Sequence, residues 1–146
     1  MSRLSPIRRK VRSFWRLPFR RQYLFLLTVG LAAYSLVMMK FFVRYARFGR
    51  PTTEPAAEVS DRALVSDVQY ALRQAARYVP WENKCRHQAD QARLLCRLYN
   101  LPYRISVGFR KNPQGGIEGH AWTTVGDHFL TGFCLPDEYV IQAVYA

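Results

Sequence analysis

The stretch ENKCRHQADQARLLCRLYN (82–100), followed almost directly by PYRISVGFR (102–110), decides the fold class, because the spacing of apolar residues changes between the two. The first segment carries small and apolar residues at intervals of three and four: Cys85, Ala89, Ala92 and Cys96. This spacing predicts an amphipathic helix, and we expect Asn100 to end it in the left-handed conformation. In the second segment apolar and polar residues alternate strictly, which predicts a half-buried strand.

A second helix and three further strands are predicted on either side of this pair. Residues 60–79 repeat apolar positions at helical spacing; Ser60 and Asp61 begin that helix, and Pro80 ends it. The further strands cover 117–125, 128–133 and 138–145, with a turn at Gly126-Asp127. Two helices followed by four strands predict an α+β fold with helices packed on an antiparallel sheet.

Positive charge is confined to the first third of the chain. Residues 1–50 contain 12 Lys and Arg and no Asp or Glu, whereas residues 51–146 contain 10 of each sign, which accounts for the formal net charge of +12. A nucleic-acid-binding domain would carry its positive charge on the folded part. We therefore expect no nucleic-acid partner.

The basic third also holds the apolar run YLFLLTVGLAAYSLVMM (23–39), which contains no charged residue. Its 17 residues fall slightly short of the roughly 20 that usually span a bilayer. Three interpretations stay open: a membrane anchor, an interfacial helix drawn to anionic lipid, and a buried helix with a solvated basic flank. A single span would place the folded part outside the cell, since most of the positive charge precedes the run. We expect instead that residues 8–48 contact the inner face of the membrane.

The chain is predicted to divide into a basic and apolar helical segment (1–50), a linker (51–59) and a folded domain (60–146). The linker follows from the Gly, Pro and Thr residues, which interrupt any helix. The three cysteines are an odd number without CxxC spacing, which indicates free thiols in a reducing, cytoplasmic compartment. Their spacing with the histidines matches no common zinc pattern, so we expect no metal site.

Cys85 and His120 are the residues that suggest chemistry. Cys85 falls in the first turn of its predicted helix, where unpaired backbone N–H groups and the helix dipole favour a thiolate and could stabilise an oxyanion. Its side chain faces inward, toward the predicted sheet. There His120, in EGHAW (118–122), offers an imidazole as a base. The competing interpretation is a buried cysteine that serves as a small apolar residue, and a core histidine with satisfied hydrogen bonds.

Residues 80–133 resemble the transglutaminase-like cysteine peptidases of lasso-peptide biosynthesis, the leader peptidases known as B2 proteins. The matching elements keep their order along the chain: Pro80-Trp81, Cys85 opening a helix, Arg-Leu-Leu at 93–95, Val-Gly-x-Arg at 107–110 and His120-Ala121-Trp122. The basic and apolar stretch RLPFRRQYLFLL (16–27) is also similar to the N-terminal region of that family. The resemblance covers most of the chain, and the combination of these elements is fairly specific.

The resemblance implies a transglutaminase- or papain-like core in which Cys85 is the nucleophile and His120 is the base. Such an enzyme would cut the leader peptide from a ribosomally made precursor through an acyl-enzyme intermediate. A separate leader-binding protein would deliver the precursor peptide, and an ATP-using lasso cyclase would then close the ring. The resemblance implies no cofactor bound by this chain.

The group that orients His120 departs from the family pattern, which often has an Asp about twelve residues after the histidine. Here that place reads Thr131-Gly132. Asp127 is rejected, because it sits at the hairpin turn, roughly 20 Å along the strand from His120. Asp137 is the acid that we name as third member, and a backbone carbonyl is the alternative.

The remaining candidates are two tryptophans. Trp81 and Trp122 flank the site, either as core aromatics or as substrate-binding residues. His87 is expected to be exposed and solvated. Two other functions stay open for the whole chain. One is a transglutaminase-like acyltransferase or amidase acting on another substrate, and the other is a non-catalytic, membrane-associated binding module.

Overall fold

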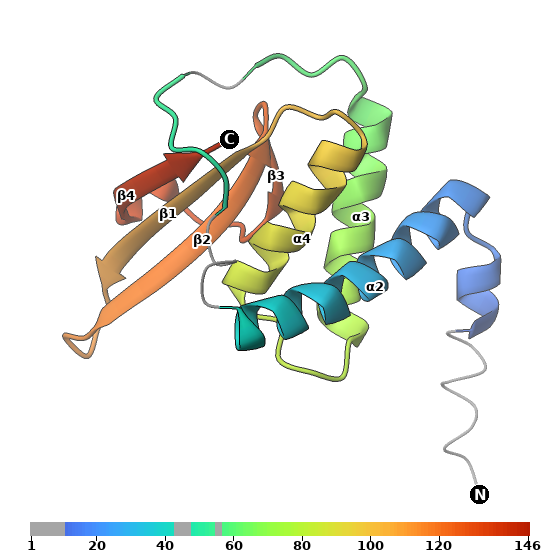
Figure 1. Ribbon diagram of the computed structural model, residues 1–146, viewed down its shortest axis with the longest axis horizontal. Helices are drawn as coiled ribbons and strands as arrows, with labels where there is room; N and C mark the ends of the chain where they lie inside the picture. The colour runs from blue at the N-terminus through green and yellow to red at the C-terminus, as the bar shows by residue number, and fades with distance from the viewer. Residues whose placement is uncertain (1–10, 43–47, 55–56) are drawn as a thin grey trace, which may run out of the picture.

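Three long helices lie on one side of a four-stranded sheet in the computed structural model, which describes residues 11–42, 48–54 and 57–146 (Figure 1). The helices are α2 (Phe19–Phe41), α3 (Arg62–Tyr78) and α4 (Cys85–Leu98). The strands are β1 (Arg104–Lys111), β2 (Ile117–Val125), β3 (His128–Thr131) and β4 (Val140–Tyr145), with a 3-10 helix η2 (Pro136–Glu138) before β4. All neighbouring strands are antiparallel, in the order β3-β2-β1-β4. The predicted α+β class is confirmed.

The boundaries of α3 and α4 follow caps that the sequence offers. Asp61 is the N-cap of α3, because its Oδ1 accepts a hydrogen bond from the backbone N–H of Leu64 at 2.8 Å. After α4, Asn100 has a φ of +51°, as expected of a left-handed helix end. The N–H of Leu101 then donates to the carbonyl of Cys96 at 2.8 Å, and the chain turns into β1.

Strand β2 carries the candidate histidine and lies inside the sheet, between β1 and β3. Its bounds, 117–125, are the predicted ones. Gly126, with a φ of +55°, makes the turn into β3. β3 ends at Thr131 and not at residue 133 as predicted, because Gly132 takes a φ of +65° and turns the chain out of the ladder.

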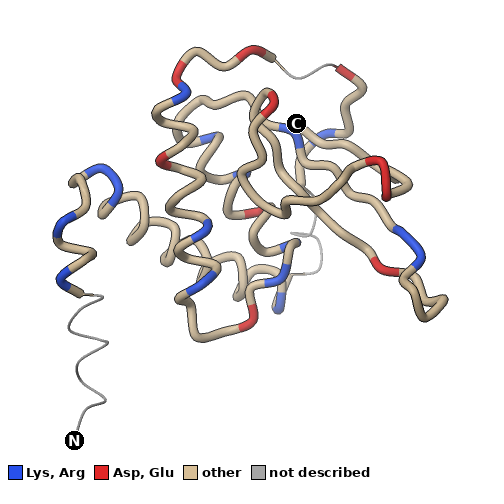
Figure 2. Tube along the Cα trace, turned by 180° about the vertical axis from the view of Figure 1, so that it is seen from behind, with Lys and Arg blue, Asp and Glu red and all other residues tan. Residues whose placement is uncertain are grey.

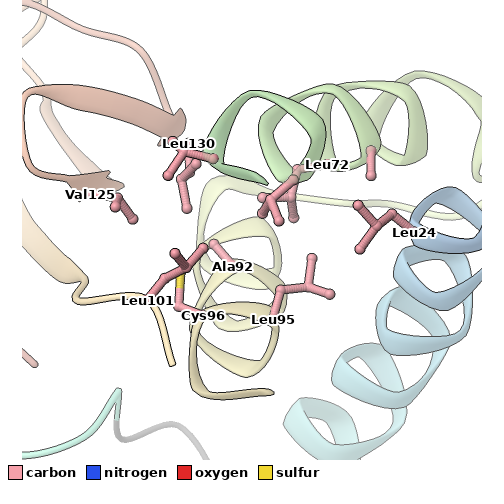
Figure 3. Close-up of a cluster of buried hydrophobic side chains, with 11 residues drawn as sticks. Leu24, Leu72, Ala92, Leu95, Cys96, Leu101, Val125 and Leu130 are labelled. Atoms are coloured by element: carbon pink, nitrogen blue, oxygen red, sulfur yellow. The ribbon is translucent and has the colours of Figure 1, made fainter. Parts of the chain in front are cut away.

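The main core lies between the helices and the sheet (Figure 3). Its buried residues come from every helix and from the sheet: Leu24, Val65, Val68, Ala71, Leu72, Ala92, Leu95, Cys96, Leu101, Val125 and Leu130. Leu24 shows that α2 contributes to this core. α2 therefore packs on α3 and α4 as a further layer (Figure 1). The division of the chain at residues 50 and 60 stays a prediction.

Candidate functional site

Cys85 is the first residue of α4. Its side chain is half-buried and packs against a second buried cluster: Phe48, Ala89, Ile105 and Ala121. Ala121 belongs to β2 and adjoins His120 in the sequence. The first turn of α4 therefore lies against β2, next to the candidate base.

Amide side chains hold the connection that precedes Cys85. The Gln88 side chain donates to the backbone carbonyl of Asn83 at 2.7 Å, and the Gln91 side chain donates to Asn83 Oδ1 at 2.8 Å. Gln91 is fully buried. These bonds fix the backbone immediately before the thiol. The apolar spacing of the sequence did not predict these contacts, because it takes no account of polar residues. The available signal was that Gln88 and Gln91 follow Cys85 at intervals of three.

His120 is half-buried on β2, and its Nε2 lies 2.9 Å from the carbonyl oxygen of Gly132. Because a carbonyl oxygen only accepts hydrogen bonds, this contact requires the proton of the neutral ring on Nε2 and leaves Nδ1 as the acceptor. Gly132 is 12 residues after His120, at the place where the resembling family often has an acid. The backbone carbonyl that we gave as the alternative is thus the group that contacts the ring.

The position after β3 accepts only glycine. Gly132 has a φ of +65°, and a Cβ there would lie 2.5 Å from the carbonyl oxygen of Ala121. A side chain would therefore have to displace the backbone of β2. The carbonyl that faces His120 is held by a backbone geometry that no other residue adopts without strain.

Two aromatic rings enclose the imidazole of His120. Trp122 stacks on it with 6.0 Å between ring centroids, and Tyr139 lies at 5.5 Å. Trp122 is only 3% exposed, so it forms the wall behind the histidine. Arg110 in turn lies over the Tyr139 ring at 5.0 Å. Tyr139 was not foreseen, because the sequence does not reveal how the segment between β3 and β4 returns to the sheet.

The structure brings the segments of Cys85 and His120 together without joining their side chains. Side chains alternate along a strand, so His120 leaves β2 on the side opposite Ala121, which belongs to the cluster beside Cys85. Among the residues that the structure describes, no hydrogen bond links the thiol to the imidazole. The thiol and the imidazole therefore do not form a preassembled pair in this structure.

Asp137 lies in η2 and is exposed. Within the described part of the chain its carboxylate makes no hydrogen bond or ion pair. Its neighbours in sequence face the site instead. Glu138 accepts a hydrogen bond from Arg110 Nη1 at 2.6 Å, and Tyr139 contacts His120.

Buried polar atoms without partners gather in the segment around the start of α4. Within the described residues, four such atoms lie between positions 81 and 91: Trp81 Nε1, Asn83 Nδ2, His87 Nδ1 and Gln91 Oε1. Trp81 and His87 are half-buried, which corrects the expectation of a solvated His87. Burial lowers the pKa of His87 below its ordinary value, which favours the neutral ring. Unpaired polar groups of this kind usually meet ordered water or a ligand.

A hollow of about 170 Å³ lies beside the site. Its lining comes from α3, from the first turns of α4 and from the end of β3, and includes Arg73, Gln88, Gly132 and Phe133. Gly132 bonds His120, and Gln88 belongs to the helix that begins with Cys85. The hollow therefore reaches α4 and the backbone that holds His120, but neither Cys85 nor His120 is among its lining residues.

The other two thiols lie in different surroundings. Cys96 is fully buried in the main core, and burial raises its pKa to about 12. Cys134 is half-buried in the segment after β3, and burial raises its pKa while Arg110 opposes the rise. Cys85 is thus the cysteine that the described structure places at the start of a helix.

Residues 28–142, most of the chain, match the family model of the Transglutaminase-like superfamily. The chain belongs to this superfamily. No curated protein and no solved structure matches it.

Proposed function

We propose that this chain is a cysteine peptidase that removes the leader peptide from a ribosomally synthesised lasso-peptide precursor. One observation carries the proposal. Cys85 opens α4 against β2, while His120 on β2 is held through Nε2 by the Gly132 carbonyl and keeps Nδ1 as a proton acceptor. The superfamily supports cysteine-type chemistry, and the resemblance of residues 80–133 supports the leader peptide as substrate.

The reaction that we propose needs only groups of this chain and water. His120 Nδ1 takes the proton of the Cys85 thiol, and the thiolate attacks the carbonyl carbon of the scissile amide. Backbone N–H groups of the first turn of α4 stabilise the oxyanion. The imidazolium then protonates the leaving amine, and water hydrolyses the thioester. Because His120 and the cluster beside Cys85 lie on opposite sides of β2, the proposed reaction requires this edge of the sheet to rearrange when the peptide binds.

The flanking groups have unequal roles in this proposal. The Gly132 carbonyl orients His120, so Asp137 is not required as the third member. Trp122 supports the imidazole from behind. Trp81 is the tryptophan that we propose to meet substrate, because it is half-buried and its indole N–H is unpaired among the described residues.

The partners that we propose follow from the resemblance. A separate leader-binding protein presents the precursor peptide, and an ATP-using lasso cyclase acts on the released core. The site would work in the cytoplasm, with residues 8–48 at the inner face of the membrane. The chain itself would need no cofactor.

Intact-mass analysis of precursor, leader-binding protein and this chain tests the proposal. We expect the wild-type protein to remove the leader. Cys85→Ala and His120→Ala should each lower the cleavage rate by on the order of 10³-fold or more. Cys134→Ser and Asp137→Asn should cleave at the wild-type rate. Cleavage that survives Cys85→Ala, or that Cys134→Ser abolishes, would reject Cys85 as nucleophile.

A transglutaminase-like acyltransferase is the second candidate, since the superfamily match covers the same core. The two functions differ in what resolves the acyl-enzyme. Adding a primary amine such as methylamine to the same assay separates them. A peptidase gives mainly the carboxylic acid product, whereas an acyltransferase gives mainly the amide, heavier than the acid by the mass of the added amine less water.

A further inference from the structure

Helix α2 is apolar on all sides, but its two faces differ in the size of their side chains. The face toward α3 and α4 buries Leu24 and three small residues, Thr28, Ala32 and Ser35. The opposite face exposes large residues, which we call the outer stripe: Phe19, Tyr23, Leu26, Val37 and Phe41. At about 100° per residue these five positions fall on one side of the helix. Contiguous apolar surface of this kind marks an interaction site.

Polar contacts fasten the small-residue face of α2 to the other helices. Near the start of α2, Arg20 and Arg21 pair with Asp67 of α3, and the distance from Arg21 Nε to Asp67 Oδ1 is 2.6 Å. Near its end, Ser35 Oγ donates to Asp90 Oδ2 of α4 at 2.7 Å. Both carboxylates are buried. The outer stripe therefore cannot turn inward without breaking contacts at both ends.

These contacts also argue against α2 as a membrane span. By length and apolar composition alone, its 23 residues would cross a bilayer. However, α2 lies along α3 and α4, which have 17 and 14 residues and are too short to span. A span would carry Asp67, Asp90 and their arginine partners into hydrocarbon, where charged groups are strongly disfavoured.

Cations and aromatic rings flank the outer stripe. Arg12 and Arg16 precede it and Lys40 lies at its end, and all three are exposed. Trp15 (70% exposed) and Phe42 are exposed aromatic residues before and after α2. The first 50 residues contain no acidic residue, and Figure 2 shows Lys and Arg without Asp or Glu along the N-terminal segment. Basic residues and aromatic rings beside an apolar helix face are typical of binding to anionic headgroups.

We propose that the outer stripe of α2 binds an anionic lipid surface, with α2 parallel to the bilayer plane and α3, α4 and the sheet above it. The proposal does not depend on the reaction. Lipid is favoured over a protein partner as the occupant, because residues 1–50 contain 12 Lys and Arg and no acidic residue, and the exposed Arg12, Arg16 and Lys40 beside the stripe complement a negatively charged surface. The buried ion pairs of α2 then stay intact.

Co-sedimentation of the full-length protein with vesicles tests the proposal. The vesicles contain phosphatidylcholine, alone or mixed with phosphatidylglycerol. We expect binding to the mixed vesicles that is at least about tenfold stronger than binding to phosphatidylcholine and that weakens with salt. The variant Leu26→Ser/Val37→Ser should bind at least about tenfold more weakly with an unchanged Tm. The matched control Ile117→Ser/Leu135→Ser changes exposed apolar residues outside α2 and should bind like wild type.

Four outcomes would overturn the proposal. Wild-type binding by Leu26→Ser/Val37→Ser would remove the role of the outer stripe. Retention in the membrane fraction after alkaline carbonate extraction would replace the parallel arrangement by a span. A lipid-free dimer that the same variant dissociates would assign the stripe to a second copy. Capture of the leader-binding protein by the stripe, without vesicle binding, would assign it to that partner.

Discussion

Gly132 acts on His120 through a main-chain oxygen, and the effect of changing it follows from the backbone. Alanine there meets a strained φ, which costs about 1–3 kcal/mol, and places Cβ 2.5 Å from the Ala121 carbonyl oxygen. We expect Gly132→Ala to lower the free energy of unfolding by more than that strain and to lower the cleavage rate, as measured by urea denaturation and the mass assay. Gly126→Ala is the matched control, because its φ is +55° but the nearest atom to its Cβ would belong to the Val59 side chain, at 3.2 Å, and the nearest backbone atom would lie at 4.0 Å. Equal losses in the two variants would contradict the role of the close contact.

The three thiols should differ in their reaction with iodoacetamide. Cys96 is fully buried and its pKa is raised to about 12, so neither access nor ionisation favours it at pH 8. We expect peptide mapping to find Cys85 and Cys134 modified in the native protein and Cys96 modified only after unfolding, with Cys85 faster than Cys134. Cys134 reacting faster than Cys85 would weaken the case for an activated Cys85.

At the residue scale, the sequence predicted where Cys85 and His120 lie but not what holds them. A cysteine before an amphipathic run and a histidine in an alternating run are local patterns. The Gly132 carbonyl, the Tyr139 ring and the Asn83 contacts depend on backbone turns and on which segments meet, and no local pattern encodes these. For the same reason the sequence left Asp137 and a backbone carbonyl as alternatives and did not identify Gly132 as the group that contacts the ring.

At the scale of elements, the ion pairs of α2 make its docking dependent on pH. Burial alone would raise the pKa of Asp67, but hydrogen bonds from Arg21 and Arg20 outweigh it, and the pKa lies below the ordinary value. The stability from this group is therefore present above the unfolded pKa of about 3.9 and is lost as pH falls through the folded value. We expect Asp67→Asn to cost about 1–2 kcal/mol at pH 7 and less below pH 4, as measured by denaturation at both pH values. A loss that does not change with pH would rule out the ion pairs as its source.

The contact between α2 and α4 gives a second prediction at this scale. Asp90 is 1% exposed, faces Arg93 at 2.7 Å and accepts a hydrogen bond from Ser35. Asp90→Ala removes the carboxylate from a buried pair and should cost about 3 kcal/mol, whereas Ser35→Ala removes one hydrogen bond and should cost about 1 kcal/mol. Denaturation curves of both variants measure these losses. Similar small losses would mean that the buried pair does little to hold the helices.

The spacing of apolar residues predicted α3, α4 and the four strands, because each presents one apolar and one polar face. It could not orient α2, whose residues are apolar all round. Which face packs inward depends on side-chain size and on two carboxylates far along the chain, Asp67 and Asp90. The end of β3 was misjudged because Phe133 continues the alternation, while the positive φ of Gly132 had already turned the chain.

At the scale of the whole molecule, α2 seals the main core. A chain that starts at Ala57 lacks Leu24 and leaves Leu72 and Leu95 uncovered on that side. Domains are stable by only about 5–15 kcal/mol, and the loss of a whole packed helix is of that order. We expect this truncated chain to bind the dye ANS and to lose its cooperative thermal transition. A chain that starts at Val11 should behave like the wild type, with no ANS binding and a cooperative transition. A cooperative transition at the wild-type Tm in the shorter chain would show that residues 57–146 fold alone.

Met39, near the end of α2, packs against the same buried cluster as Cys85. A protein seated on lipid through α2 would therefore carry its thiol close to the headgroups, at a fixed height. Substrate that also adheres to the surface would search for it in two dimensions, and the local concentration would exceed that in solution. The reaction rate would then depend on the lipid area available per molecule, and excess vesicles would slow it by spreading enzyme and substrate apart.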